Sequence, residues 1–138
     1  MRRPLVALPL VLAALLAAGC TASNSSSGDF DGAQKDVADV VGDLSSAAGT
    51  GDGSKICTDV LAKSLADQMA AGGSTCAQQL DDALKDADSF GLTVEKVAIN
   101  GQDATATVKA DRGKKDINQA IVLVKQGAGW RISEFQGR

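Results

Sequence analysis

The side chains in this sequence best suited to chemistry are its cysteines. A cysteine thiolate can act as a nucleophile, ligate a metal or form a disulfide. Besides Cys20 near the N-terminus, the chain holds Cys57 and Cys76, and it has no histidine to activate a thiol or share a metal. An even pair of cysteines outside the cytosol typically forms a disulfide. We therefore predict a Cys57–Cys76 disulfide, whose loop of about 20 residues would stabilise the fold by roughly 3 kcal/mol. The alternative is two free thiols in a metal or catalytic site.

Carboxylates are the other candidates for catalysis, as general acids or bases. Asp81 adjoins Asp82, and Asp86 lies two residues before Asp88. Positions one or two apart on a helix do not face each other, so these residues predict a solvated acidic face, with Asp81 and Lys85 as an i,i+4 surface pair. Catalysis near neutral pH most often uses histidine, which this sequence lacks. We expect no catalytic residue and no enzymatic activity. An enzyme that uses Asp or Glu alone is the least favoured alternative.

The glycine-rich residues 49–55 are the nearest approach to a ligand-binding motif. They end in Ser54-Lys55, but the lysine does not follow a glycine and no strand precedes the segment, as a phosphate-binding loop requires. The segment instead predicts a helix break with Ser54 as an N-cap. Asp29 and Asp31 begin like a calcium loop but lack its later ligands, and no zinc spacing occurs. We expect no metal and no cofactor.

The charge of the chain argues against nucleic acid as a partner. The formal net charge is −3 at pH 7, and no arginine-rich or aromatic-interleaved patch occurs. Acidic residues concentrate in residues 20–91, which hold 12 acidic and 4 basic side chains, against 5 and 8 in residues 92–138. The sequence therefore predicts an acidic half and a basic half.

The N-terminal residues have the organisation of an export signal. Arg2 and Arg3 precede an apolar run of 14 positions, 5–18. Such a run is too short for a transmembrane helix and typical of a signal peptide. Small residues lead directly into Cys20, and the segment Leu16-Ala17-Ala18-Gly19-Cys20 resembles the lipobox of bacterial lipoproteins.

The lipobox resemblance implies cleavage before Cys20 and transfer of a diacylglycerol to its thiol. Acyl chains such as palmitate would then hold the protein at the cell membrane, on its extracytoplasmic face. A plain secreted protein, in which Cys20 is incidental, is the alternative. The predicted organisation is a signal peptide over residues 1–19, the lipidated cysteine with a flexible polar tether over residues 20–29, and one globular domain over residues 30–138.

The first part of this domain is predicted to be helical. Apolar residues recur at helical spacing in three segments separated by glycines. The expected helices run from Gly32 to about Ala48, from Ser54 to Gly72-Gly73, and from Thr75 through Ala87. Two capping-box patterns mark the first and third helix starts, Asp31 with Gln34 and Thr75 with Gln78. Cys57 and Cys76 then lie in the first turns of the second and third helices.

The rest of the domain is predicted to be extended. Asn100-Gly101 is a strong two-residue hairpin signal, and short turns force neighbouring strands to be antiparallel. The expected strands are Leu92–Ile99, Ala104–Ala110, Ile117–Lys125 and Trp130–Phe135. The predicted fold class is α+β, with three N-terminal helices packed on a curled four-stranded antiparallel meander sheet.

This order of elements resembles the nuclear transport factor 2-like, or cystatin-like, α+β cone, especially in small actinobacterial lipoproteins. The last hairpin carries the resemblance: Val122-Leu123-Val124-Lys125 turns through Gly127 and Gly129 into Trp130-Arg131-Ile132-Ser133-Glu134-Phe135. The Cys57/Cys76 pair fits secreted members of the family. The resemblance implies a cone that often holds small apolar molecules. Trp130 and Phe135 would line such a cavity or, alternatively, fill the core between helices and sheet.

Enzymes of this fold place histidine, tyrosine or paired carboxylates inside the cone. The chain has neither histidine nor tyrosine, so no catalytic residue carries over. We expect a non-enzymatic interaction or accessory module, anchored to the membrane through Cys20, with a cell-envelope protein as its partner. The alternative is a carrier that holds a small apolar ligand or lipid in the cone.

Overall fold

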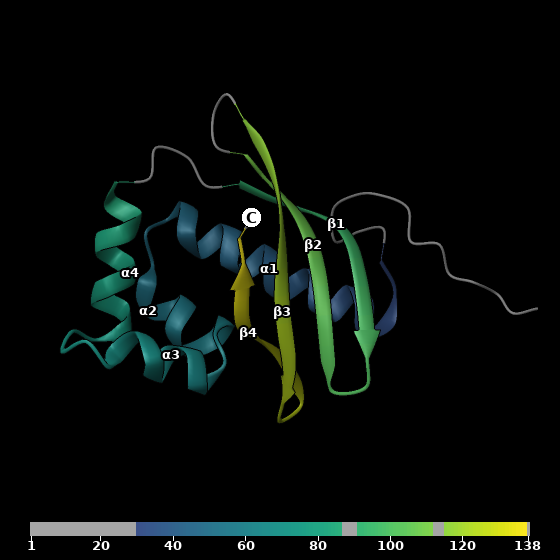
Figure 1. Ribbon diagram of the computed structural model, residues 1–138, viewed down its shortest axis with the longest axis horizontal. Helices are drawn as coiled ribbons and strands as arrows, with labels where there is room; N and C mark the ends of the chain where they lie inside the picture. The colour runs from purple at the N-terminus through teal and green to yellow at the C-terminus, as the bar shows by residue number, and fades with distance from the viewer. Residues whose placement is uncertain (1–29, 87–90, 112–114, 138) are drawn as a thin grey trace, which may run out of the picture.

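The computed structural model describes residues 30–86, 91–111 and 115–137. The predicted signal peptide, Cys20 and the tether up to residue 29 lie outside the described residues. The domain is α+β, as predicted (Figure 1). Its helical elements are α1 (Gly32–Gly49), α2 (Gly53–Lys55), a π-helical turn η2 (Ile56–Val60), α3 (Lys63–Ala70) and α4 (Cys76–Lys85). Its strands are β1 (Gly91–Asn100), β2 (Asp103–Asp111), β3 (Asp116–Gln126) and β4 (Gly129–Gln136).

The four strands form the predicted antiparallel meander, in the order β1-β2-β3-β4. β1 and β4 are its two edges, so the sheet does not close. Each outer strand has a bulge, at Glu95 in β1 and Ser133 in β4, where one residue is left out of the register. Such bulges bend a strand and increase its twist. The first hairpin turn is Gly101-Gln102, one residue later than predicted, because Asn100 still pairs with Asp103.

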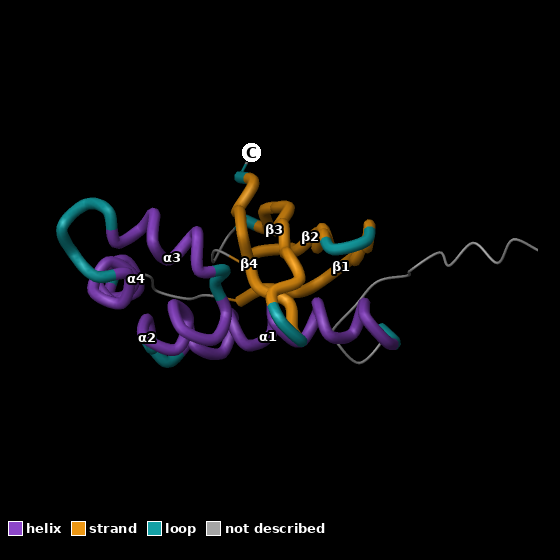
Figure 2. Tube along the Cα trace, turned by 90° about the horizontal axis from the view of Figure 1, so that it is seen from below, coloured by secondary structure: helices purple, strands orange, loops and turns teal. Residues whose placement is uncertain are grey.

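α1 lies along one face of the sheet (Figure 2). Its apolar stripe is buried at Val37, Val41 and Leu44, as its helical spacing predicted. The facing strands contribute alanine and branched aliphatic residues, which are 0 to 2 % exposed at Ala104, Ala106, Val108, Ile121, Leu123 and Ile132. Full burial of one such aliphatic side chain contributes roughly 1.5–3 kcal/mol. We call α1 and the four strands the α1–sheet unit.

α1 also covers the outer edge of β1. The Gln34 side chain donates from Nε2 to the carbonyl of Val97 at 3.2 Å, and the Leu92 amide donates to Ser45 Oγ at 3.2 Å. These bonds occupy backbone groups that an edge strand otherwise offers to another chain. The capping box predicted at Asp31 is therefore wrong, because Asp31 makes no side-chain cap bond and Gln34 reaches the sheet.

The predicted second helix is interrupted, so the prediction of three helices is wrong. The chain leaves the helix after η2, and Leu61 forms a parallel bridge with Ile132 on the edge of β4. The Ala62 amide donates to the Ile132 carbonyl at 2.7 Å, and α3 begins directly afterwards. Pairing with the sheet therefore outweighs the local helical preference.

α2, η2, α3 and α4 gather beside β4, at one edge of the sheet (Figures 1 and 2). We call this group, residues 53–85, the helical lobe. The third predicted helix is α4, where Thr75 Oγ1 accepts from the Gln78 amide and Gln78 Oε1 accepts from the Thr75 amide. That capping box is confirmed. No helix among the described residues is long and apolar enough to cross a membrane.

Candidate functional site

An open depression of about 380 Å³ lies where the α1–sheet unit meets the helical lobe. Three elements build it: one face of α1, the turn η2, and the β3–β4 turn with the start of β4. Its lining residues are Asp36, Asp39, Val40, Asp59, Ala128, Gly129, Trp130 and Arg131. We call it the Trp130 depression. Asp36, Asp39 and Val40 reach it together because positions three and four apart share one face of a helix.

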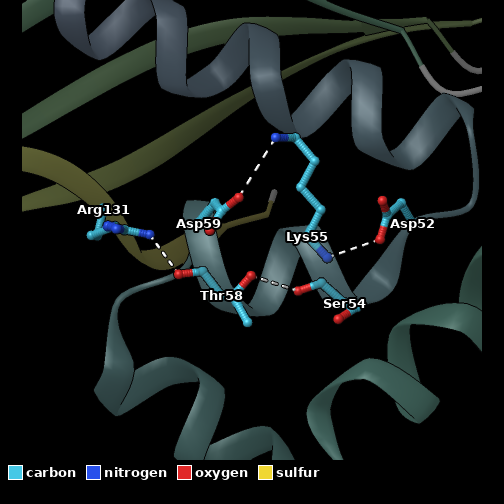
Figure 3. Close-up of polar contacts among 6 residues, drawn as sticks. All are labelled: Asp52, Ser54, Lys55, Thr58, Asp59 and Arg131. Carbon is cyan, nitrogen blue, oxygen red and sulfur yellow. Dashed lines mark hydrogen bonds and ion pairs between the residues drawn. The ribbon is translucent and has the colours of Figure 1, made fainter.

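The lobe side of this depression is formed by Asp59, which belongs to the π-helical turn η2. Figure 3 shows the polar contacts around that turn. Asp52 Oδ1 accepts from the Lys55 amide at 2.9 Å and caps the start of α2, so the N-cap is Asp52 and not the predicted Ser54. The Leu61 amide donates to the Ile56 carbonyl at 2.9 Å, which is the i→i+5 bond of a π turn. π turns of this kind are frequent at functional sites.

Arg131 joins β4 to the end of that turn. Because the chain becomes extended at Leu61, the carbonyl of Thr58 loses the amide partner that a continuing helix would supply. Arg131 Nη1 donates to this carbonyl at 2.8 Å (Figure 3). The guanidinium therefore caps the helical turn and remains part of the depression wall.

Lysines partner two of the three carboxylates. Lys35 Nζ lies 2.6 Å from Asp39 Oδ2, and Lys55 Nζ lies 3.6 Å from Asp59 Oδ2. The hydrogen bond and charge of Asp39 raise the pKa of Lys35 above 10.5. Exposed pairs of this kind contribute little to stability. The depression is thus a surface of mixed charge, and no metal-binding cluster of three or more ligands occurs among the described residues.

Trp130, with Val40 and Ala128, forms the apolar part of the depression. It is 4 % exposed and belongs to the core. Of its two predicted roles, filling the core accounts for nearly all of its surface. Lys125 Nζ lies 5.5 Å from the centroid of its ring, within cation–π range. Its Nε1 has no hydrogen-bond partner among the described residues. A buried donor left unsatisfied costs about 1–3 kcal/mol.

Phe135 does not lie beside Trp130 in this site. It pairs with Ile121 near the end of β4, is 47 % exposed, and does not line the Trp130 depression. The structure therefore does not bring the two predicted cavity residues together in this depression.

The predicted disulfide is present between Cys57 and Cys76, with their Cα atoms 6.1 Å apart. Cys57 lies in η2 and Cys76 is the first residue of α4, so the bond joins two elements of the helical lobe.

The predicted Asp81–Lys85 pair is wrong. Lys85 Nζ instead binds Asp82 Oδ1 at 2.9 Å, and Asp81 Oδ1 accepts from the Gly53 amide at 2.9 Å. Asp86 is exposed, and Asp88 lies outside the described residues. Asp81 therefore has a structural role, because its hydrogen bond attaches α4 to α2.

The contact between Arg131 and the π turn was not predicted from the sequence, because it joins residues 73 positions apart. The sequence does indicate one wall of the depression, because the spacing of Asp36, Asp39 and Val40 places them on one face of a helix.

Comparison of this chain with protein-family models, with curated proteins and with solved structures finds no significant match.

Proposed function

We propose that this protein is a lipid-anchored, extracytoplasmic interaction module without enzymatic activity, and that its partner contacts the Trp130 depression. The lipobox-like segment ending at Cys20 supports the anchor. The partner is a protein of the cell envelope. The nuclear transport factor 2-like resemblance is part of this proposal, supported by the order of helices and a four-stranded meander.

The observation that supports an interaction function is that the depression is open and lined by charged residues. It is open to solvent, and four of its eight lining residues are charged: Asp36, Asp39, Asp59 and Arg131. Arginine is a side chain that protein interfaces favour, and three exposed or half-buried aspartates suit the polar rim of such an interface. A carrier of a small apolar ligand needs a mostly apolar pocket that buries most of the ligand surface. The lining therefore favours protein contact over the carrier, which is the second candidate.

The anchor is tested by metabolic labelling with an alkyne palmitate analogue in the native host. Wild-type protein is expected in the membrane fraction with label. Cys20→Ala is expected to lose both the label and the membrane association. The C57S/C76S variant is the matched control and should remain labelled. Unlabelled wild-type protein in the medium would show a plain secreted protein.

The contact surface is tested by photo-crosslinking in intact cells. A photoreactive amino acid at position 36 should give a discrete protein adduct. The same probe at Asp82, an exposed residue of α4 that does not line the depression, is the matched control. An adduct at position 82 but not 36 would move the interface to the lobe. A stoichiometric small ligand in native mass spectrometry of the protein from cells would support the carrier instead.

A further inference from the structure

The attachment of α4 to the rest of the protein differs from that of every other described helix. α4 packs against α2, α3 and η2, all within the helical lobe. Cys76 is its only fully buried residue, and Leu80 and Leu84 are half-buried. The core of the domain is otherwise built by α1, η2 and the strands. α4 therefore contributes little to the apolar burial that holds the α1–sheet unit together.

Beyond the bonds to its own N-cap, Thr75, two side-chain hydrogen bonds join α4 to other described residues. The Gly53 amide donates to Asp81 Oδ1 at 2.9 Å, and Gln79 Nε2 donates to the carbonyl of Met69. Met69 Sδ also lies 4.0 Å from Cys76 Sγ. Both hydrogen-bond partners belong to residues 53–69, so these contacts hold α4 within the lobe alone.

The disulfide connects α4 to a firmly anchored part of the molecule. Cys57 lies in η2 between Ile56 and Val60, each 1 % exposed, and the chain then bridges β4 at Ile132. Cutting the Cys57–Cys76 bond would leave η2 in place, because Ile56, Val60 and the Leu61 bridge do not depend on it. It would leave α4 attached through two half-buried leucines and the two hydrogen bonds to Gly53 and Met69, besides its own N-cap at Thr75.

We propose that the disulfide attaches α4 to the lobe in a redox-sensitive way. Its reduction releases α4 from the lobe while the α1–sheet unit stays folded. A dithiol reductant supplies the electrons. Its first thiolate attacks one of the two sulfurs and forms a mixed disulfide, and the other protein sulfur leaves and takes up a proton. The second reductant thiolate then attacks that mixed disulfide. The reductant becomes a cyclic disulfide, and Cys57 and Cys76 both become thiols.

Release of α4 changes the surface of the protein. Leu80 and Leu84 would leave the edge of the core, against which Leu65 and Met69 also pack. Reduction would thus expose an apolar strip on each side without unfolding the sheet. This device goes beyond the proposed partner site, because the Trp130 depression contains no residue of α4.

Hydrogen exchange of the full chain, purified in detergent and measured with and without dithiothreitol, tests the proposal. The amides of residues 80–85 should exchange about tenfold faster or more after reduction, while the amides of β2 and β3 keep their protection. The C57S/C76S variant retains Cys20 and should show the fast α4 exchange without reductant. Dithiothreitol should not change that variant further.

Two outcomes would overturn the proposal. If α4 and the central strands accelerate together, the disulfide stabilises the whole domain and no local opening exists. If α4 keeps its protection in both the reduced protein and the C57S/C76S variant, the contacts at Gly53 and Met69 suffice to hold it. Should the variant fail to fold, the reduced wild-type protein still distinguishes local from global opening.

Discussion

The α1–sheet unit and the helical lobe are held together by different means. In the α1–sheet unit, alternate residues of β2 are buried at Ala104, Ala106, Val108 and Ala110, and each strand pairs with its neighbour along most of its length. In the lobe, α3 has no buried residue and α4 has only Cys76. These two helices of the lobe rely on a disulfide, a close-packed glycine and side-chain caps in place of apolar burial, whereas η2 buries Ile56 and Val60 in the core.

This difference follows from the size of the domain. A small domain buries a smaller fraction of its surface than a large one, so its core need not extend under every element. Here that core is used by α1, η2 and the sheet. The peripheral helices are attached by a covalent bond and local polar contacts, which order a segment without much apolar area.

The largest expected effect is at Ile132, where the two regions meet. Ile132 is fully buried, pairs with Leu123 and bridges Leu61. Ile132→Ala should lower the free energy of unfolding by about 4 kcal/mol, because it leaves a cavity in the core. Leu84→Ala in α4 is the matched control and should cost about 1 kcal/mol, since Leu84 is only half-buried. Urea unfolding followed by the fluorescence of Trp130, the single tryptophan, measures both.

Equal costs at the two positions would contradict this division of the molecule. If the alanine variant does not fold, Ile132→Val should cost about 1–1.5 kcal/mol for one carbon removed, against about 1 kcal/mol for the three carbons removed by Leu84→Ala, so the cost per carbon still separates the two sites.

The same division explains what the sequence could predict. The strands follow an alternation of two residues and end at glycine turns, and both signals are local. β1 was expected at Leu92–Ile99 and occupies Gly91–Asn100. The break at Leu61 was missed because Ile56, Val60 and Leu65 fit a continuous helix. It is caused by a bond to Ile132, about 70 residues away along the chain, and no local pattern records such a bond.

The candidate site likewise could be predicted only where the sequence signal was local or compositional. The Cys57–Cys76 disulfide was predictable from the number of cysteines and the absence of histidine. The position of Trp130, buried in the core but also at the wall of a charged depression, depends on how η2 and α1 meet the last hairpin. Arg131 enters the site only because the helix ends at Val60 and leaves the Thr58 carbonyl unpaired by the backbone.

A smaller effect is expected at Gly53, where α2 approaches α4 most closely. A Cβ at this position would overlap Asp81 Oδ1 and lie 2.8 Å from the Ala77 carbonyl oxygen. Gly53→Ala should therefore cost about 2 kcal/mol and loosen α4. Gly72→Ala is the control, because its nearest neighbour would be at an ordinary 3.6 Å. Thermal unfolding of the oxidised protein compares them. A neutral Gly53→Ala would mean that Asp81 moves freely and that the lobe is packed more loosely than described.

The two helix starts give a still smaller contrast. Thr75→Ala removes both the acceptor for the Gln78 amide and the reciprocal geometry of the capping box, so it should cost about 1 kcal/mol. Asp31→Ala at the start of α1 should be close to neutral, because Asp31 makes no side-chain cap bond. Chemical denaturation of both variants measures the difference. A larger loss for Asp31→Ala would restore the capping box that the sequence predicted there.

The smallest expected effect compares one surface ion pair from each region at alkaline pH. Hydrogen bonds and charge from Asp82 and Asp116 raise the pKa values of Lys85 and Lys109, respectively, above 10.5. A lysine whose pKa is raised by folding contributes its full stabilisation below its unfolded pKa. That contribution is lost as the pH rises through the folded value. The free energy of unfolding should therefore fall above about pH 10.5, and the chain has no tyrosine to titrate in the same range.

Lys85→Met and Lys109→Met should each reduce this alkaline decrease. Lys109→Met should reduce it more, because the Lys109–Asp116 side chains are 43 % and 57 % exposed, against 72 % and 75 % for Lys85 and Asp82. Urea titrations at pH 9 and 11.5 measure the change, and 1 M salt should diminish it in the wild type. Equal curves for both variants and the wild type would mean that neither pair contributes. The two regions would then differ only in apolar burial and in the covalent bond.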